Sequence, residues 1–123
     1  MNPAPLVVVI DDDESLRVAL VGLLRSCGYV ARGFGSAEDF LHGKVDGLAC
    51  LVTDIQMAGM SGIELKRHLS AQGLDTPTIM ITARAGPEVE LGAFASGAVC
   101  VLKKPFEADA LIGCIERALH PPD

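Results

Sequence analysis

Short apolar runs alternate with polar stretches along the chain. Four runs are rich in β-branched residues and bounded by polar residues or turn formers: Leu6 to Ile10, Leu48 to Thr53, Thr78 to Thr82 and Val99 to Leu102. Runs of this length and composition predict β-strands buried on both faces. A weaker run from Tyr29 to Phe34 contains Arg32 and Gly33, which favours an edge strand.

Between these runs, apolar residues recur at intervals of three and four, the period of an amphipathic helix. The spacing is clearest at Leu16, Leu20, Leu23, Leu24 and Cys27, and again at Leu111, Ile112, Ile115 and Leu119. Helix start signals agree, with Asp13 as a cap, Pro87 in a first turn, and capping boxes at Ser36-Ala-Glu-Asp39 and Ser61-Gly-Ile-Glu64. Strict alternation of strands and helices predicts a doubly wound α/β fold, with about five parallel strands and helices on both faces.

Composition narrows the class of protein. A chain of 123 residues fits one domain with a continuous core. No apolar run approaches the eighteen or more residues that a membrane span needs, and the start has no signal-peptide pattern, so we expect a cytoplasmic protein without membrane contact. The formal net charge of −6 argues against direct binding to nucleic acid, which rests on Lys and Arg neutralising phosphates.

The four cysteines, Cys27, Cys50, Cys100 and Cys114, lack the spacing of a zinc site. We expect all four to be small buried apolar residues, with neither a disulfide nor zinc. The three histidines, His42, His68 and His120, have no partner spacing and are expected at the surface.

Polar residues follow four of the predicted strands. Asp11 and Asp12 follow the first, Asp54 the third, Thr82 the fourth, and Lys103 and Lys104 the fifth. In a doubly wound sheet the functional crevice lies outside the carboxyl ends of the strands, so these side chains should share one rim. Strands lie about 4.8 Å apart, which brings the carboxylates close together.

Carboxylates this close repel one another unless a cation or protons intervene. Helix capping by the acidic run from Asp11 to Glu14 is an alternative for that run alone, but it leaves Asp54, Thr82 and Lys104 unexplained. An all-oxygen cluster suits Mg²⁺ better than zinc, and Mg²⁺ commonly shares its coordination shell with a phosphate. Lys104 can then balance phosphoryl charge and Thr82 can donate a hydrogen bond, which leaves Asp54 as the natural nucleophile.

Four blocks of the sequence resemble the receiver domain of bacterial two-component response regulators. They are "VVVIDDDESLRVAL", "LVTDIQMAGMSGIEL", "IMITARAG" and "GAVCVLKKPF", in family order and at family spacing. Together, "SAEDFL", "LVTD", "MSGIEL", "SGAV" and "KPFE" resemble the nitrogen-fixation regulator subfamily in particular. The resemblance spans about Leu6 to Leu119 and implies a flavodoxin-like sheet of order 2-1-3-4-5 with five helices, so that residues 1–123 form one receiver domain.

The resemblance also assigns roles. Asp54 would accept a phosphoryl group from a sensor histidine kinase. Asp11, Asp12, Asp54 and the backbone carbonyl of Gln56 would hold Mg²⁺, with Asp11 acting mainly through water. Thr82 would be the switch hydroxyl, and Lys104 would bind the phosphoryl group and precede a cis Pro105. Phosphorylation would then re-pose the face formed by the fourth helix, fifth strand and fifth helix, and so drive homodimerisation or release an output domain.

Three positions depart from the family pattern. Ala58-Gly59 follows Met57 where Met-Pro is usual, which leaves the loop less restricted. Val101 stands at the position of the aromatic switch residue, and Arg84 places a long cation near the mouth of the site. Val101 cannot swing as a ring does, so the usual coupling to Thr82 lacks one partner.

Other functions fit less well. A phosphohydrolase with an aspartyl-phosphate intermediate would need an acid two residues after Asp54, where Gln56 stands, and a flavin carrier would need a phosphate loop in place of the acidic run. The chain is therefore expected to be a signalling domain, with chemistry limited to its own phosphorylation and dephosphorylation. A degenerate receiver that acts as a docking surface stays open, as do the cognate kinase, the oligomeric state and any output domain.

Overall fold

The computed structural model describes residues 4–84 and 86–120, which form a five-stranded parallel sheet of order β2-β1-β3-β4-β5. The strands are β1 (Leu6–Ile10), β2 (Val30–Phe34), β3 (Leu48–Asp54), β4 (Thr78–Thr82) and β5 (Cys100–Lys103). Each strand was predicted within one residue of its observed bounds. The sequence order reverses between β1 and β3, and this is the point at which doubly wound folds place their sites.

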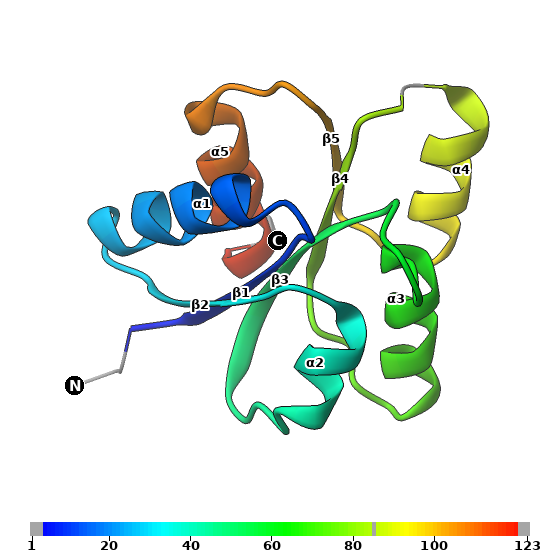
Figure 1. Ribbon diagram of the computed structural model, residues 1–123, viewed down its shortest axis with the longest axis horizontal. Helices are drawn as coiled ribbons and strands as arrows, with labels where there is room; N and C mark the ends of the chain where they lie inside the picture. Colours follow the sequence, from blue (N-terminus) through cyan, green and yellow to red (C-terminus); the bar gives the residue numbers. More distant parts are fainter. Residues whose placement is uncertain (1–3, 85, 121–123) are drawn as a thin grey trace.

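Five helices cover the sheet, as predicted. They are α1 (Glu14–Ser26), α2 (Ala37–His42), α3 (Gly62–Ala71), α4 (Pro87–Ala95) and α5 (Ala108–Leu119). Figure 1 shows α1 and α5 on one face and α2, α3 and α4 on the other. Alternate residues of β1 point to opposite faces of the sheet. Val7 and Val9 pack against α1 and α5, whereas Val8 and Ile10 pack against α2 and α3.

Local caps set the start of the helices beside the site. The Asp13 side chain accepts a hydrogen bond from the Leu16 N–H, and Pro87 lies in the first turn of α4. Ser61 and Glu64 form the predicted reciprocal capping box. At Ser36 the prediction was half wrong: its side chain accepts from the Asp39 N–H, but among the described residues the Asp39 side chain accepts no hydrogen bond from the Ser36 N–H in return.

Two burial predictions were wrong. β5 is an edge strand, so Val101 and Leu102 are only partly buried and not buried on both faces as predicted. Cys27 is exposed because it caps the C-terminus of α1, beyond the last turn that faces the sheet, whereas the other three cysteines are buried as expected. All four cysteines are free, and the three histidines are exposed.

Within the described residues, no helix is both long enough and apolar enough to span a membrane. Ala85, in the third of the four sequence blocks, lies outside the described part of the chain, as do residues 1–3 and 121–123.

Candidate functional site

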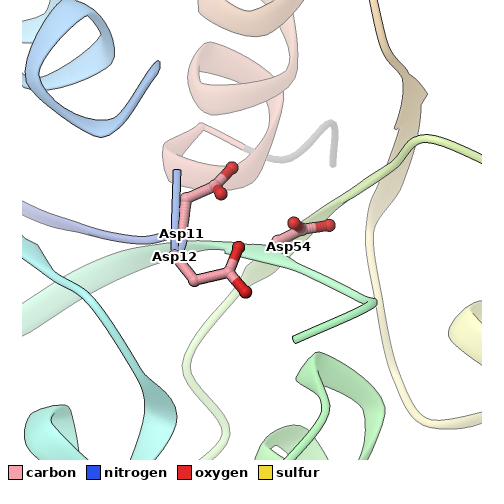
Figure 2. Close-up of side chains that lie close together, drawn as sticks. All are labelled: Asp11, Asp12 and Asp54. Carbon is pink, nitrogen blue, oxygen red and sulfur yellow. The ribbon is translucent and has the colours of Figure 1, made fainter. Parts of the chain in front are cut away.

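Three carboxylates meet at the carboxyl ends of β1 and β3, as the sequence predicted. Asp11 and Asp12 directly follow β1, and Asp54 is the last residue of β3. Each offers one oxygen within 4.8 Å of the others, and Figure 2 shows the three side chains gathered in one space. Asp11 and Asp54 are buried, whereas Asp12 is exposed.

Backbone contacts hold this cluster in place. The Asp11 N–H donates to the Phe34 carbonyl at 3.2 Å, which extends the β1–β2 pairing by one residue. Asp11 Oδ1 accepts from the Asp13 N–H at 2.9 Å, so the cap of α1 and the cluster are parts of one turn. The turn therefore leaves the second oxygen of Asp11 free to contact Lys104.

Lys104 joins two of the acids. Its Nζ lies 3.1 Å from both Asp54 Oδ2 and Asp11 Oδ2, and the contact with Asp54 is also a hydrogen bond. Burial by itself lowers the pKa of Lys104, but the contacts with Asp11 and Asp54 outweigh this effect and the pKa is raised. Lys104 is therefore a cation in the site. The Lys104-Pro105 bond is cis, as expected, while Lys103 is exposed to solvent.

One lysine does not balance three acids. Burial raises the pKa of Asp54; the hydrogen bond from Lys104 opposes that rise, and the charge of Asp11 adds to it. Asp54 Oδ1 is buried without a hydrogen-bond partner among the described residues, and the buried Asp11 Oδ2 has only its ionic contact with Lys104. Such atoms are costly unless a further cation or donor reaches them.

The arrangement fits a hard divalent cation. Its donors are all carboxylate oxygens, which Mg²⁺ prefers, and ligands on opposite sides of Mg²⁺ lie about 4.2 Å apart, close to the extent of this cluster. Two of the buried oxygens have free lone pairs. The residues present therefore suit Mg²⁺ in both charge and size.

Thr82 lies at the end of β4 beside this cluster. Its Oγ1 is 2.9 Å from Gln56 Oε1 and 2.8 Å from the Arg84 carbonyl, and it accepts from the Arg84 N–H at 3.0 Å. A hydroxyl has one proton, so it can donate to only one of these two acceptors at a time. The side chain of Gln56 was not predicted to have a role, and it competes with the Arg84 carbonyl for the proton of the Thr82 hydroxyl.

Two further side chains reach the site from outside the predicted set. Arg17 of α1 donates from Nη1 to the Asp11 carbonyl at 2.8 Å, and it passes over Gly33, where a Cβ would lie 3.0 Å from Arg17 Cγ. Glu38 of α2 accepts from the Met60 N–H in the loop after β3. Gly33 indicates that another side chain passes closely over this strand, which is the space that Arg17 occupies. In the sequence it was interpreted only as a feature of an edge strand.

The fold and the site together define a doubly wound α/β domain with an acidic cluster at its switch point, and comparison with known proteins gives its family. Residues 7–116 match the response regulator receiver domain, and the chain belongs to this family. This assigns it to the signalling proteins of two-component systems and leaves the flavin carrier and the phosphohydrolase without support.

Relatives in sequence include transcriptional regulators. The chain is 38% identical over 116 residues to FixJ of Bradyrhizobium diazoefficiens, covering 93% of this chain and 56% of FixJ. It is 36% identical over 119 residues to DctD, the C4-dicarboxylate transport transcriptional regulatory protein of Rhizobium meliloti, covering 96% of this chain and 26% of DctD. The chain thus spans about half of the first relative and about a quarter of the second.

Solved structures agree with these relatives. The crystal structure of FixJ-N superposes with a TM-score of 0.87 at 35% identity, covering all of this chain and 98% of that one. The response regulator StyR superposes with a TM-score of 0.86 at 42% identity, covering 94% of this chain and 59% of that one. The predicted strand order and the similarity to the nitrogen-fixation regulators are both confirmed.

Proposed function

We propose that Asp54 is the phosphoacceptor of this receiver domain. The observation that carries the proposal is the pairing of Asp54 with Lys104 at 3.1 Å within the cluster that Asp54 forms with Asp11 and Asp12. Asp54 Oδ1 is free of hydrogen bonds to described residues, so it has a lone pair for attack on phosphorus. Lys104 holds the other oxygen and supplies positive charge where the phosphoryl oxygens would lie.

Mg²⁺ is the proposed cofactor, held by Asp11, Asp12, Asp54 and the backbone carbonyl of Gln56. The oxygen-only donor set and the unpartnered buried oxygen Asp54 Oδ1 support this assignment. When bound, the ion would offset the negative charge that phosphoryl transfer gathers on the oxygens. Asp11, which lies deepest and already contacts Lys104, would act mainly through water.

The donor of the phosphoryl group is proposed to be a phosphohistidine on a sensor kinase. An Asp54 oxygen forms the new P–O bond as the P–N bond to the imidazole breaks, and the departing imidazole takes up a proton. Hydrolysis of the resulting acyl phosphate by water returns Asp54 and inorganic phosphate. Phosphorylation and dephosphorylation of its own Asp54 are the only chemistry that we assign to the chain. Its role is otherwise that of a signalling domain.

Output is proposed to run from Thr82 to the face formed by α4, β5 and α5. The Thr82 hydroxyl would leave Gln56 and Arg84 to donate to a phosphoryl oxygen. Val101 on β5 packs with Met80 and Ala93, so a shift of β4 would reach it without an aromatic ring. The same face exposes the apolar side chains Leu91, Phe94 and Val99, which favours pairing with a second copy or contact with an output domain.

We further propose that residues 1–123 form one receiver domain that acts in the cytoplasm without direct contact with nucleic acid or membrane. The family match covers residues 7–116, and the net charge of −6 opposes binding to a phosphate backbone.

The experiment is intact-mass measurement after incubation with acetyl phosphate, with and without Mg²⁺, on the wild type and Asp54→Asn. A gain of one phosphoryl group that needs both Mg²⁺ and Asp54 is expected. If the mass is unchanged, the same assay with a phosphorylated histidine kinase as donor should give the gain. No gain from either donor contradicts the proposal and leaves the domain as a docking surface.

A further inference from the structure

The loop between β3 and α3, residues 55–61, is tied to the rest of the protein at few points. At its base, the Ile55 N–H donates to the Ile81 carbonyl at 2.8 Å and the Gly62 N–H donates to the Ile55 carbonyl at 3.1 Å. Within residues 56–60, the only backbone hydrogen bond made to described residues is from the Met60 N–H to Glu38 Oε2, at 2.9 Å. One carboxylate from another element thus tethers the backbone of this loop.

The loop and Glu38 fit each other closely. Gly59 has a φ of +79°, a conformation that favours glycine, and a Cβ at this position would lie 2.6 Å from Glu38 Oε2. The glycine therefore provides both the turn and the space for the carboxylate. Ala58 and Gly59 do not restrict φ as a proline would, so the local sequence does not fix this loop by itself.

Glu38 is presented by a well-packed element. Its neighbours Ala37 and Phe40 are buried in the core cluster beneath α2 and α3, and Met57 and Met60 of the loop pack against the same cluster. Glu38 Oε1 is buried without a hydrogen-bond partner among the described residues. The hydrogen bond from Met60 lowers the pKa of Glu38, so the side chain is a carboxylate at neutral pH.

The position of this loop matters because it carries Gln56. The carbonyl of Gln56 is the proposed fourth protein ligand of Mg²⁺, and its side chain contacts the Thr82 hydroxyl. Three residues lie between Gln56 and the tethered Met60, and no other backbone hydrogen bond holds that stretch to described residues. Release of the backbone at Met60 will therefore change the position of Gln56.

We propose that Glu38 is a positioning residue for the metal site: by holding the Met60 N–H, it fixes the conformation of the loop from which the Gln56 carbonyl would reach an ion held by Asp12 and Asp54. The inference rests on the proposed Mg²⁺ site. Glu38 touches neither the ion nor the phosphoryl group, and it acts through the loop backbone. It provides from α2 the restraint that Ala58 and Gly59 do not provide locally.

The test compares Glu38→Ala, Glu38→Gln and Asp39→Ala. Glu38→Gln keeps an oxygen that can accept from Met60, and Asp39→Ala removes an exposed acid of the same helix that makes no side-chain contact with the loop among the described residues. Amide hydrogen exchange at Met60 reports the tether, and Mg²⁺ titration followed by the amide resonances of Asp12 and Gln56 reports the metal site. The chain has no tryptophan whose fluorescence could follow the titration, so NMR is used.

In Glu38→Ala, exchange at Met60 should accelerate roughly tenfold, as loss of a hydrogen bond to a charged acceptor implies. Mg²⁺ affinity should fall about tenfold, the effect of removing a residue that orients metal ligands. Glu38→Gln should retain most of both properties and Asp39→Ala should alter neither. If Glu38→Ala does not fold, Glu38→Asp, one methylene too short to reach Met60, replaces it with the same expectations.

Faster exchange at Met60 with unchanged Mg²⁺ affinity would overturn the proposal. It would show that the loop had been released and that Mg²⁺ binding does not depend on the tether. Unchanged exchange would also overturn it. Equal weakening by Asp39→Ala would reduce the effect to net charge and contradict the role of Glu38. Absence of Mg²⁺ binding in the wild type would instead refute the proposed metal site, and this role would fall with it.

Discussion

The ammonium group of Lys104 lies 3.1 Å from Asp54 Oδ2, which joins the carboxyl ends of two strands that are not neighbours in the sheet. The same group lies 3.1 Å from Asp11 Oδ2. Lys104 therefore pairs with two of the three acids, and the carboxylate cluster retains an excess of negative charge. This imbalance would favour binding of a further cation, and its consequences can be measured in stability as well as in activity.

Replacement of Lys104 by Met should destabilise the protein in Mg²⁺-free buffer. The substitution leaves Asp11 and Asp54 buried without their cation, and we expect a loss of about 2 kcal/mol, below the cost for a fully buried pair because the Lys104 side chain is 22% exposed. The pKa of Asp54 should rise further, since the hydrogen bond that lowers it is lost. Chemical denaturation and carboxyl-carbon NMR measure the two effects.

Lys103→Met is the matched control, since it removes the same charge from the exposed neighbouring residue. It should change neither property. Equal destabilisation by both substitutions would show that net charge matters and the contact with Asp54 does not.

Removal of the Asp54 charge should stabilise the Mg²⁺-free protein at neutral pH. Folding raises the pKa of Asp54, mainly through burial, so the ionised carboxylate opposes folding at pH values above its folded-state pKa. Asp54→Asn should gain about 1 kcal/mol at pH 7.5, or about 4 °C in Tm. The gain should shrink as the pH falls through the raised pKa and be absent below the unfolded value of about 3.9.

Thermal unfolding at pH 7.5 and pH 4 distinguishes this outcome. Asp46→Asn, which removes a charge from an exposed loop, is the control and should show no comparable gain. A loss of stability in Asp54→Asn at pH 7.5 would contradict the charge excess that we infer.

Mg²⁺ should stabilise the wild type. A ligand that binds only the folded state at ten times its Kd adds about 1.4 kcal/mol. Asp12→Asn should lose most of this gain because Asp12 belongs to the oxygen cluster. Glu14→Gln removes an equal charge from the same acidic run outside the cluster and should retain the gain. Melting curves across a Mg²⁺ titration give the comparison, and an identical response of the two variants would argue against a defined site.

Thr82 should couple phosphorylation to β5. In the wild type, phosphorylation should shift the amide resonances around Val101, and Thr82→Ser should preserve that shift because it keeps the hydroxyl. Thr82→Val has a similar shape without the hydroxyl and should abolish the shift while Asp54 is still phosphorylated. Resonances that respond equally in Thr82→Val would place the output elsewhere.

The strand-end rule explains why most of the site was predictable from the sequence. Asp11, Asp54 and Thr82 each end or follow a strand, and the backbone of a parallel sheet brings such positions to one rim regardless of side-chain detail. The contact of Lys104 follows from the same rule, because its N–H extends the β4–β5 pairing to the Thr82 carbonyl at 2.8 Å.

Other features depend on long side chains and on exposure, which local patterns do not encode. Glu38 and Met60 are 22 positions apart in the sequence, and their hydrogen bond depends on how α2 packs. The sequence therefore indicated Glu38 only as part of an expected helix cap. The side chain of Gln56 was overlooked because only its backbone carbonyl had a predicted role. Cys27 was misplaced because its helical spacing extends one residue past the end of α1.

The most direct test of the central claim is to locate the phosphoryl group. The protein is incubated with acetyl phosphate and Mg²⁺ and then reduced with borohydride, which converts an aspartyl phosphate to homoserine, and peptide mass mapping identifies the altered position. Homoserine at position 54 alone, and none without Mg²⁺, is the predicted result. Homoserine at Asp11 or Asp12, or at no aspartate of a chain that has gained phosphate, would contradict the assignment of Asp54.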